Sequence, residues 1–408
     1  MRNKVALIIS AAALLCTATA GEAAVKETDI YSFTGGNDGS MPEAGLIAGP
    51  NHNLFGTTTS GGAYHNGVVF ELAPPKGGAT AWTQTTLYSF TGGADGGSPH
   101  AALLMDDKHN LYGTAYSGGA DGQGVVFKLH KAKGQWKYSV LWTFTGGNDG
   151  GVPSGSLSMD SAGNLYGTTM QGGTGVVGTV FELSPPTSGK QWTETVLYNF
   201  TGNNDGGQPM GNVLLGADGN IYGTTDGYGE YNYGIVYRLT PPQSGSEWNL
   251  SVLHAFQGGS DGEVPRDGLI QGPDGTLYGT TAGFSNSRGN VFKLNPDGSG
   301  YEVIYTIAGG QGFTGNGPWS TVSMGDDGKL YGTTFAAGES ALGEVFQLRP
   351  REGKSWVAKV LYTFPGQTGG QYSYSKVLID KLGRLYGTTH GVAGQQGFYP
   401  GTVWRIKP

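Results

Sequence analysis

Five aspartates that recur in glycine-rich loops are the residues of this chain best suited to chemistry. They are Asp38, Asp95, Asp149, Asp205 and Asp261. Each can cap its own turn, because an aspartate side chain readily accepts hydrogen bonds from nearby backbone amides. Their oxygens also suit Ca²⁺, but the chain lacks the alternating acidic residues of a calcium-binding loop. The pattern therefore favours turn caps, keeps calcium as an alternative and predicts no other cofactor.

A second group of residues, mostly aromatic, is suited to holding a ligand. Three tyrosines and an asparagine crowd the loop at 228–233, and Asp205 lies in the loop before it. Tyrosine presents a large apolar face with a polar tip, which suits sugar rings or a protein surface. The predicted ligand-binding residues are Tyr228, Tyr231, Asn232, Tyr233, Asp205, Phe398 and Tyr399. The alternative is that these rings only cover glycine-rich backbone.

The other polar residues form no recognisable catalytic motif. No two of the seven histidines have the i, i+4 spacing of a helical metal site. Gly353-Lys354-Ser355 lacks the upstream glycine of a phosphate-binding loop, because Leu348 stands in its place. The only cysteine, Cys16, lies close to the start of the chain. The sequence therefore predicts no catalytic residue and favours a protein that is not an enzyme.

These loops are positioned by a pentapeptide, Leu-Tyr-Gly-Thr-Thr, that occurs seven times with small variations. Its central glycines are Gly56, Gly113, Gly167, Gly223, Gly279, Gly332 and Gly387. Their spacing of 53 to 57 residues indicates a repeat architecture. The pentapeptide reads as a strand, and a glycine inside a strand marks a close approach of another group. Tryptophans that recur in register, such as Trp82 and Trp136, are likewise expected to belong to the scaffold.

Each repeat contains four strand-like segments joined by turns, and the two ends of the chain complement each other. A lone fourth strand, Asp29–Phe33, precedes the first repeat, and the last repeat ends on its third strand, Thr402–Ile406. Pairing these two strands closes a ring and removes exposed sheet edges. We therefore expect an all-β, seven-bladed β-propeller over residues 25–408, with four antiparallel strands per blade. Either the first or the third strand of each repeat could be innermost, and the order resembles that of NHL-type propellers, which implies the first.

The repeats resemble the GloVer tandem repeat of exported bacterial choice-of-anchor proteins. The match is carried by Gly219-Asn220-Ile221-Tyr222-Gly223-Thr224-Thr225, by the Val-Phe-Glu-Leu type of third strand, and by residues 192–202. The resemblance covers nearly the whole chain after its N-terminal segment. It implies an exported or surface protein and no particular reaction. Because no anchoring tail follows the last strand, the sequence favours a secreted or periplasmic protein, with association to the cell surface as an alternative.

The N-terminal segment predicts where the protein is located, and the charge of the chain limits the classes of partner that it is expected to bind. Residues 1–24 have a basic head, an apolar stretch and small residues, which predicts a secretory signal peptide. The net charge is −7, without a basic run, so nucleic acid is not an expected partner. No later stretch is apolar enough to span a membrane. We expect a monomer that binds a glycan or an extracellular protein on its loops.

Two other functions stay open at the level of sequence. One is a propeller enzyme, a hydrolase or lyase, that acts on a carbohydrate polymer. The other is a purely structural surface protein. An enzyme would gather titratable groups where the loops converge. The topology predicts that the aspartate loops and the aromatic loops share one end of the ring, so a site of any kind is expected there.

Overall fold

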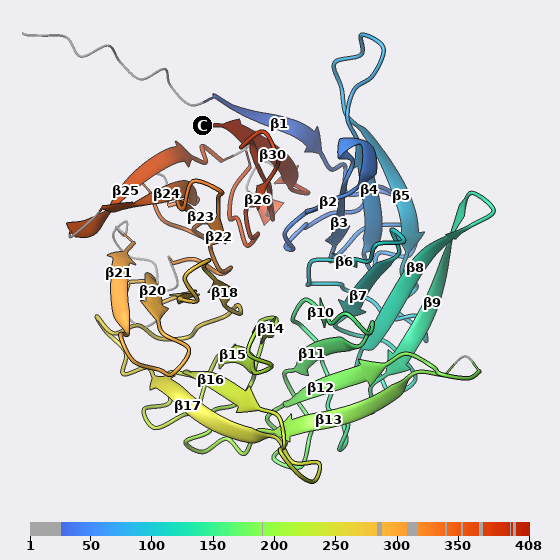
Figure 1. Ribbon diagram of the computed structural model, residues 1–408. Coiled ribbons are helices and arrows are strands. Elements are labelled where there is room, and N and C mark those ends of the chain that lie inside the picture. Colours follow the sequence, from blue (N-terminus) through green and yellow to red (C-terminus); the bar gives the residue numbers. More distant parts are fainter. Residues whose placement is uncertain are drawn as a thin grey trace, which may run out of the picture.

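The protein forms a ring of seven four-stranded sheets around a central axis (Figure 1). The computed structural model describes residues 26–408 except 190, 284–287, 308–316, 339–340, 352–353, 367–369, 392 and 395–396. The predicted signal peptide at 1–24 and Phe284 lie outside the described residues. The only described helix is a single 3₁₀ turn at Pro50–His52, and no helix in the described part is long and apolar enough to cross a membrane.

The four strands of each blade run antiparallel, and in six blades their order from the axis outward is the order of the chain, whereas in the last blade β1 is outermost. The innermost strands are β2 (Ile47–Ala48), β6 (Leu104–Met105), β10 (Ser158–Met159), β14 (Leu214–Leu215), β18 (Ile270–Gln271), β22 (Ser323–Met324) and β26 (Leu378–Ile379). The second strands are β3 (Leu54–Thr58), β7 (Leu111–Ala115), β11 (Leu165–Thr169), β15 (Ile221–Thr225), β19 (Leu277–Thr281), β23 (Leu330–Thr333) and β27 (Leu385–Thr389). The third strands are β4 (Val68–Ala73), β8 (Val125–Ala132), β12 (Thr179–Ser184), β16 (Ile235–Thr240), β20 (Asn290–Leu294), β24 (Glu344–Arg351) and β30 (Thr402–Lys407). The outer strands are β5 (Thr83–Ser89), β9 (Gln135–Thr143), β13 (Thr193–Asn199), β17 (Asn249–Ala255), β21 (Glu302–Thr306), β25 (Lys354–Thr363) and β1 (Lys26–Ser32).

The predicted ring closure is confirmed by the last blade. Its outer strand is β1, which pairs antiparallel with β30 from Lys26↔Lys407 to Ser32↔Thr402, with an irregularity between Asp29 and Tyr31. A short hairpin of β28 (Ala393–Gly394) and β29 (Gly397–Phe398) precedes β30. The first and last described segments of the chain therefore belong to one sheet, and the closed ring leaves no end blade.

The pentapeptide forms the second strand of every blade, and its glycine is required by packing. A Cβ at Gly167 would lie 2.6 Å from the Phe181 ring of the neighbouring strand, and the other six pentapeptide glycines are as close to an aromatic ring. The predicted structural role of these glycines is therefore confirmed.

The first threonine of each pentapeptide joins its blade to the next one. Its hydroxyl donates a hydrogen bond to a backbone carbonyl of the following blade, with distances of 2.8 to 3.2 Å. The pairs are Thr57 and Ala101, Thr114 and Gly155, Thr168 and Gly211, Thr224 and Asp267, Thr280 and Ser320, Thr333 and Ser375, and Thr388 and Ala44. The same type of bond thus crosses all seven blade junctions, including the one between the last blade and the first.

Apolar side chains fill the space between adjacent blades. One buried cluster, for example, combines Phe70 and Val68 of the first blade with Tyr386 and Val403 of the last. The recurring tryptophans belong to these layers: Trp136 packs edge-on against Phe55 of the preceding blade, with ring centroids 6.2 Å apart. Their predicted scaffold role is therefore confirmed.

The loops that join the outer strand of one blade to the inner strand of the next lie beside the loops that join second and third strands. Isolated bridges such as Ser40↔Ser60 and Gly97↔Ser117 tie the two kinds of loop together. We call this end of the ring the loop face. It carries the candidate functional site.

Candidate functional site

One position on the loop face holds a different residue in every blade. It follows the loop proline, or Ser373 in the last blade, and precedes the inner strand. The seven residues, called here the mouth residues, are Glu43, His100, Ser154, Met210, Arg266, Trp319 and Tyr374. All seven line a cavity of about 650 Å³ that continues between the inner strands. The propeller axis is therefore hollow at the loop face, and its rim is chemically varied.

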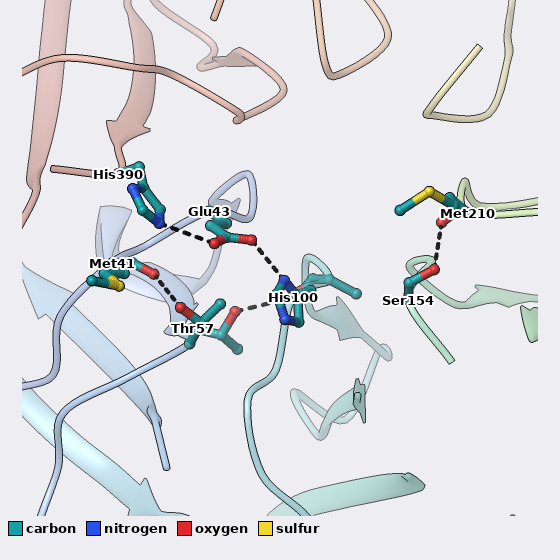
Figure 2. Close-up of polar contacts among 9 residues, drawn as sticks. Met41, Glu43, Thr57, His100, Ser154, Met210 and His390 are labelled. Atoms are coloured by element: carbon teal, nitrogen blue, oxygen red, sulfur yellow. Dashed lines mark hydrogen bonds and ion pairs between the residues drawn. The ribbon is translucent and has the colours of Figure 1, made fainter. Parts of the chain in front are cut away.

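Glu43 is held between two histidines from the neighbouring blades (Figure 2). Its Oε2 lies 2.6 Å from His100 Nδ1, and its Oε1 lies 3.1 Å from His390 Nε2. Burial on its own would raise the pKa of Glu43, but the hydrogen bonds and charges of the two histidines outweigh it and lower the pKa to about 2. Glu43 is therefore an anion at any ordinary pH.

His390 also contacts an acceptor on its other ring nitrogen. Its Nδ1 lies 2.5 Å from the carbonyl oxygen of Gly391. Each ring nitrogen of His390 therefore lies beside an oxygen that accepts hydrogen bonds. His100 differs, since its side chain is 34% exposed and lines the cavity, with its ring against Tyr116 at 4.8 Å.

An arc of aromatic and charged side chains continues from His390 along the rim. The ring of Tyr374 lies 5.2 Å from that of His390 and 4.8 Å from that of Trp319. The Arg266 guanidinium lies 3.9 Å above the Trp319 ring and 3.7 Å from Asp226 Oδ1. Burial raises the pKa of Asp226, and the charge of Arg266 opposes this rise. Burial, together with the charge of Glu43, raises the pKa of Tyr374 to about 12.

Deeper in the cavity, the wall carries Asp267, Ser320 and Lys376 from three successive blades. Asp267 accepts hydrogen bonds from the backbone amides of Gly268 at 2.8 Å and Thr321 at 2.9 Å. Burial lowers the pKa of Lys376, while the charge of Asp267 partly restores it. These groups give the interior of the channel a polar, charged wall beneath the aromatic rim.

The predicted aspartates lie in five separate turns, and each turn holds its own aspartate. Thr34 donates its backbone amide to Asp38 at 2.8 Å, and Tyr31 donates its hydroxyl at 2.9 Å. Amides of equivalent residues bond the other four aspartates, Asp95, Asp149, Asp205 and Asp261. Among the described residues, no group of three or more His, Cys, Asp or Glu side chains is arranged to hold a metal ion.

The predicted tyrosine loop lies on the loop face but does not line the cavity. Tyr231 and Tyr233 are 42% and 38% exposed. The rings of Tyr228 and Tyr233 lie over backbone: a Cβ at Gly207 would be 2.8 Å from Tyr228, and one at Gly258 would be 3.0 Å from Tyr233. The structure thus brings Tyr228, Tyr231, Asn232 and Tyr233 together.

The other predicted binding residues lie apart from that loop. Asp205 is bonded within its own turn to Thr201 and Tyr198. Tyr399 lines a smaller hollow of about 210 Å³ near the ring closure. Of Phe398 the structure describes only the backbone, in β29.

Sequence reasoning missed the mouth residues, although the sequence contains a signal for them. Aligning the seven repeats on the loop proline, which six of them share, gives a following column in which every residue is different. A fold needs the repeated residues, so a column that differs in every repeat marks a position free to serve a ligand. Its location at the axis is evident only once the inner strand is known.

The site combines three kinds of group that recognise small polar molecules. Trp319, with Arg266 over one face, and Tyr374 supply aromatic rings, Glu43 and His100 supply a hydrogen-bonding pair, and Lys376 supplies a cation in the same lining. Pockets that bind ligands typically combine such rings with a few polar groups that fix orientation. The arrangement can therefore hold a sugar-sized molecule and orient it.

Comparisons with known proteins agree with the repeat and the fold. A model described as the Gloeobacter/Verrucomicrobia repeat matches residues 19–215 and again residues 209–408. No curated protein matches the chain. A solved puromycin-hydrolysing peptidase of Mycobacterium tuberculosis is similar with a TM-score of 0.52 at 11% identity, covering 90% of this chain and 52% of its own. At this identity, the likeness shows the fold alone.

Two further solved structures are similar at lower scores. A protein of unknown function from Dyadobacter fermentans DSM 18053 has a TM-score of 0.46 at 13% identity, covering 95% of this chain and 100% of its own. A chain of a nidogen/laminin complex has a TM-score of 0.41 at 16% identity, covering 65% of this chain and 82% of its own.

Proposed function

Since this chain belongs to the Gloeobacter/Verrucomicrobia repeat family, we propose that it is an exported binding propeller that holds a glycan at the centre of its loop face. The observation that carries the proposal is the ring of mouth residues, all different, around one cavity of about 650 Å³. A repeat that serves only as a scaffold has no reason to carry a different residue in every blade at a position that lines the axis.

Chemistry favours a glycan among the ligands that fit. Sugar rings stack their C–H faces on aromatic side chains, and their hydroxyls take hydrogen bonds from charged groups. Trp319 and Tyr374 offer two rings 4.8 Å apart in a T-shaped pair, and the Glu43–His100 pair lies on the same rim. Arg266 stacks on Trp319 and supports that ring in place.

The test is binding of the purified protein to an array of extracellular polysaccharides, followed by calorimetry with a ligand that binds. Trp319→Ala should weaken binding at least tenfold, because stacking on one aromatic ring contributes about 1–3 kcal/mol. Tyr64→Ala is the matched control, since Tyr64 is 57% exposed on the loop face and does not line the cavity. Binding of a protein instead of any glycan, or of nothing, would contradict the proposal.

The tyrosine loop at 228–233 provides a second surface on the same face. The exposed rings of Tyr231 and Tyr233 support a contribution to longer ligands that extend outward from the cavity. Replacing both by alanine should weaken binding of long chains and leave binding of short ones unchanged. If the double variant lost affinity equally for long and short glycan chains, the main contacts would lie on this loop instead of in the cavity.

A hydrolase or lyase acting on the bound glycan is the second candidate function, favoured by the Glu43–His100 pair. A carboxylate that bonds one imidazole nitrogen orients the ring so that the other nitrogen can move a proton. Prolonged incubation with a bound polysaccharide should then produce new chain ends, and His100→Ala should abolish them. If the polysaccharide kept its length, the hydrolase or lyase function would be contradicted and only the binding function would stand.

Export and location are part of the proposal. The predicted signal peptide at 1–24 supports transport out of the cytoplasm, to the periplasm, the medium or the cell surface. Cell fractionation with an antibody to the chain tests this, and N-terminal sequencing of the exported form would locate the cleavage.

A further inference from the structure

The lower wall of the cavity carries hydrogen-bond donors that the described chain leaves available. The Lys376 side chain lines the cavity, and no carboxylate oxygen of a described residue lies within 4.0 Å of its amine. Ser320, on the neighbouring blade, is only 4% exposed and lines the same cavity. Its Oγ has no hydrogen-bond partner among the described residues. A buried hydroxyl without a partner is costly and indicates a missing acceptor.

The nearby carboxylate does not supply that acceptor. Asp267 already accepts the backbone amides of Gly268 and Thr321, one on each oxygen. Because these two bonds hold it against the wall between blades, Asp267 compensates the charge of Lys376 only through space. Lys376 and Ser320 therefore line the same cavity, and neither side chain has a hydrogen-bond or ion-pair partner among the described residues.

A negatively charged acceptor suits these donors best, because a hydrogen bond between two ionised groups is stronger than one to a neutral oxygen. A carboxylate fits, because its two oxygens can bond an ammonium group and a hydroxyl at once. The rings of Trp319 and Tyr374 line the same cavity and suit the flat face of a sugar. We propose that the cavity is specific for acidic glycans, with the carboxylate of a uronic acid residue bound between Lys376 and Ser320. This inference rests on the proposed function and names the class of glycan.

The experiment compares three pairs of acidic and neutral oligosaccharides by calorimetry with the purified protein. Oligogalacturonate, oligomannuronate and oligoglucuronate are each measured beside their methyl esters, which keep the size and remove the charge. The protein should bind one acidic member at least tenfold more tightly than its ester, since a hydrogen-bonded charge is worth about one such factor or more. Raising the salt concentration should reduce this preference.

Two substitutions at one position separate charge from shape. Lys376→Met keeps the length of the side chain and should remove the preference for the acid over its ester. Lys376→Arg keeps the charge and should retain part of the preference. Ser320→Ala should reduce the preference for the acid over its ester, and an unchanged melting temperature would show that each variant is folded.

The outcomes distinguish a failure of the inferred specificity for acidic glycans from a failure of the proposed glycan binding itself. Equal binding of acid and ester, or a preference that survives Lys376→Met, overturns the inference. Binding of neutral glycans that depends on Trp319 leaves the proposed function standing while the inference fails. Absence of any glycan binding overturns both.

Discussion

Replacing Glu43 by glutamine tests the charged contact at the rim most directly. Glutamine keeps the shape of the side chain and removes its charge. The pKa of Glu43 falls from its ordinary 4.5 to about 2, and each unit of pKa corresponds to about 1.4 kcal/mol, so the ionised form contributes about 3 kcal/mol. The side chain is only 20% exposed, so solvent screens this contribution little.

The sign of the pH dependence follows from the lowered pKa. The unfolded carboxylate takes up its proton near pH 4.5, whereas the folded one keeps its charge down to pH about 2. The stabilisation is therefore present in full above pH 4.5 and is lost as the pH falls toward 2. In urea unfolding, Glu43→Gln should be less stable than the original protein by about 3 kcal/mol at pH 6. This difference should shrink steadily as the pH falls to about 2.

The matched control is Glu230→Gln, which changes an exposed glutamate on the same face. It should leave the free energy of unfolding within about 0.5 kcal/mol of the original protein at every pH. Two results would refute the reasoning. One is a Glu43→Gln variant as stable as the original protein at pH 6. The other is a difference that does not change with pH, which would show that the lost contact depends on shape and not on charge.

Three further predictions concern the scaffold. Gly167→Val should lower the free energy of unfolding by about 1–3 kcal/mol without changing ligand affinity, because even a Cβ there would lie 2.6 Å from a ring atom; reduced affinity with full stability would make the glycine functional. Thr168→Val removes the 2.9 Å bond to Gly211 across a blade junction and should cost about 1–3 kcal/mol in urea unfolding. Burial, with help from the charge of Asp29, raises the pKa of Glu27 from 4.5 to about 7, so the folded state keeps a proton that the unfolded one loses. Stability should therefore fall as the pH rises from 4.5 to 7, and Glu27→Gln should remove that fall; an unchanged pH profile would contradict this.

The fold could be predicted because its requirements repeat. A glycine beneath an aromatic ring is needed at Gly167 for the same reason as at the other six pentapeptides, so the sequence shows the requirement seven times. The pairing of β1 with β30 could also be predicted, because each of these strands lacks a partner within its own end of the sequence. Which strand is innermost could not be derived, because both blade orders give the same pattern of short strands and turns.

The cavity was harder to predict because its residues have no common chemistry. Glu43 and Trp319 occupy equivalent positions, yet nothing in either local sequence indicates that both face the axis. Their approach depends on seven blades meeting at one point, which is a property of the whole ring. The tyrosines at 228–233 drew attention because they are adjacent in the chain, which is the only kind of proximity that a sequence displays directly.

The pairing of β1 with β30 has a consequence for how the protein is made. β1 leaves the ribosome before the other described strands, but its partner β30 is the last described strand to be made, and the two pair from Lys26↔Lys407 to Ser32↔Thr402. Contacts between such distant parts of a chain form slowly, because a long loop must close first. Until then both strands present open edges on which a second chain could add. The same strand that completes the ring is therefore the point at which newly made copies are most exposed to one another.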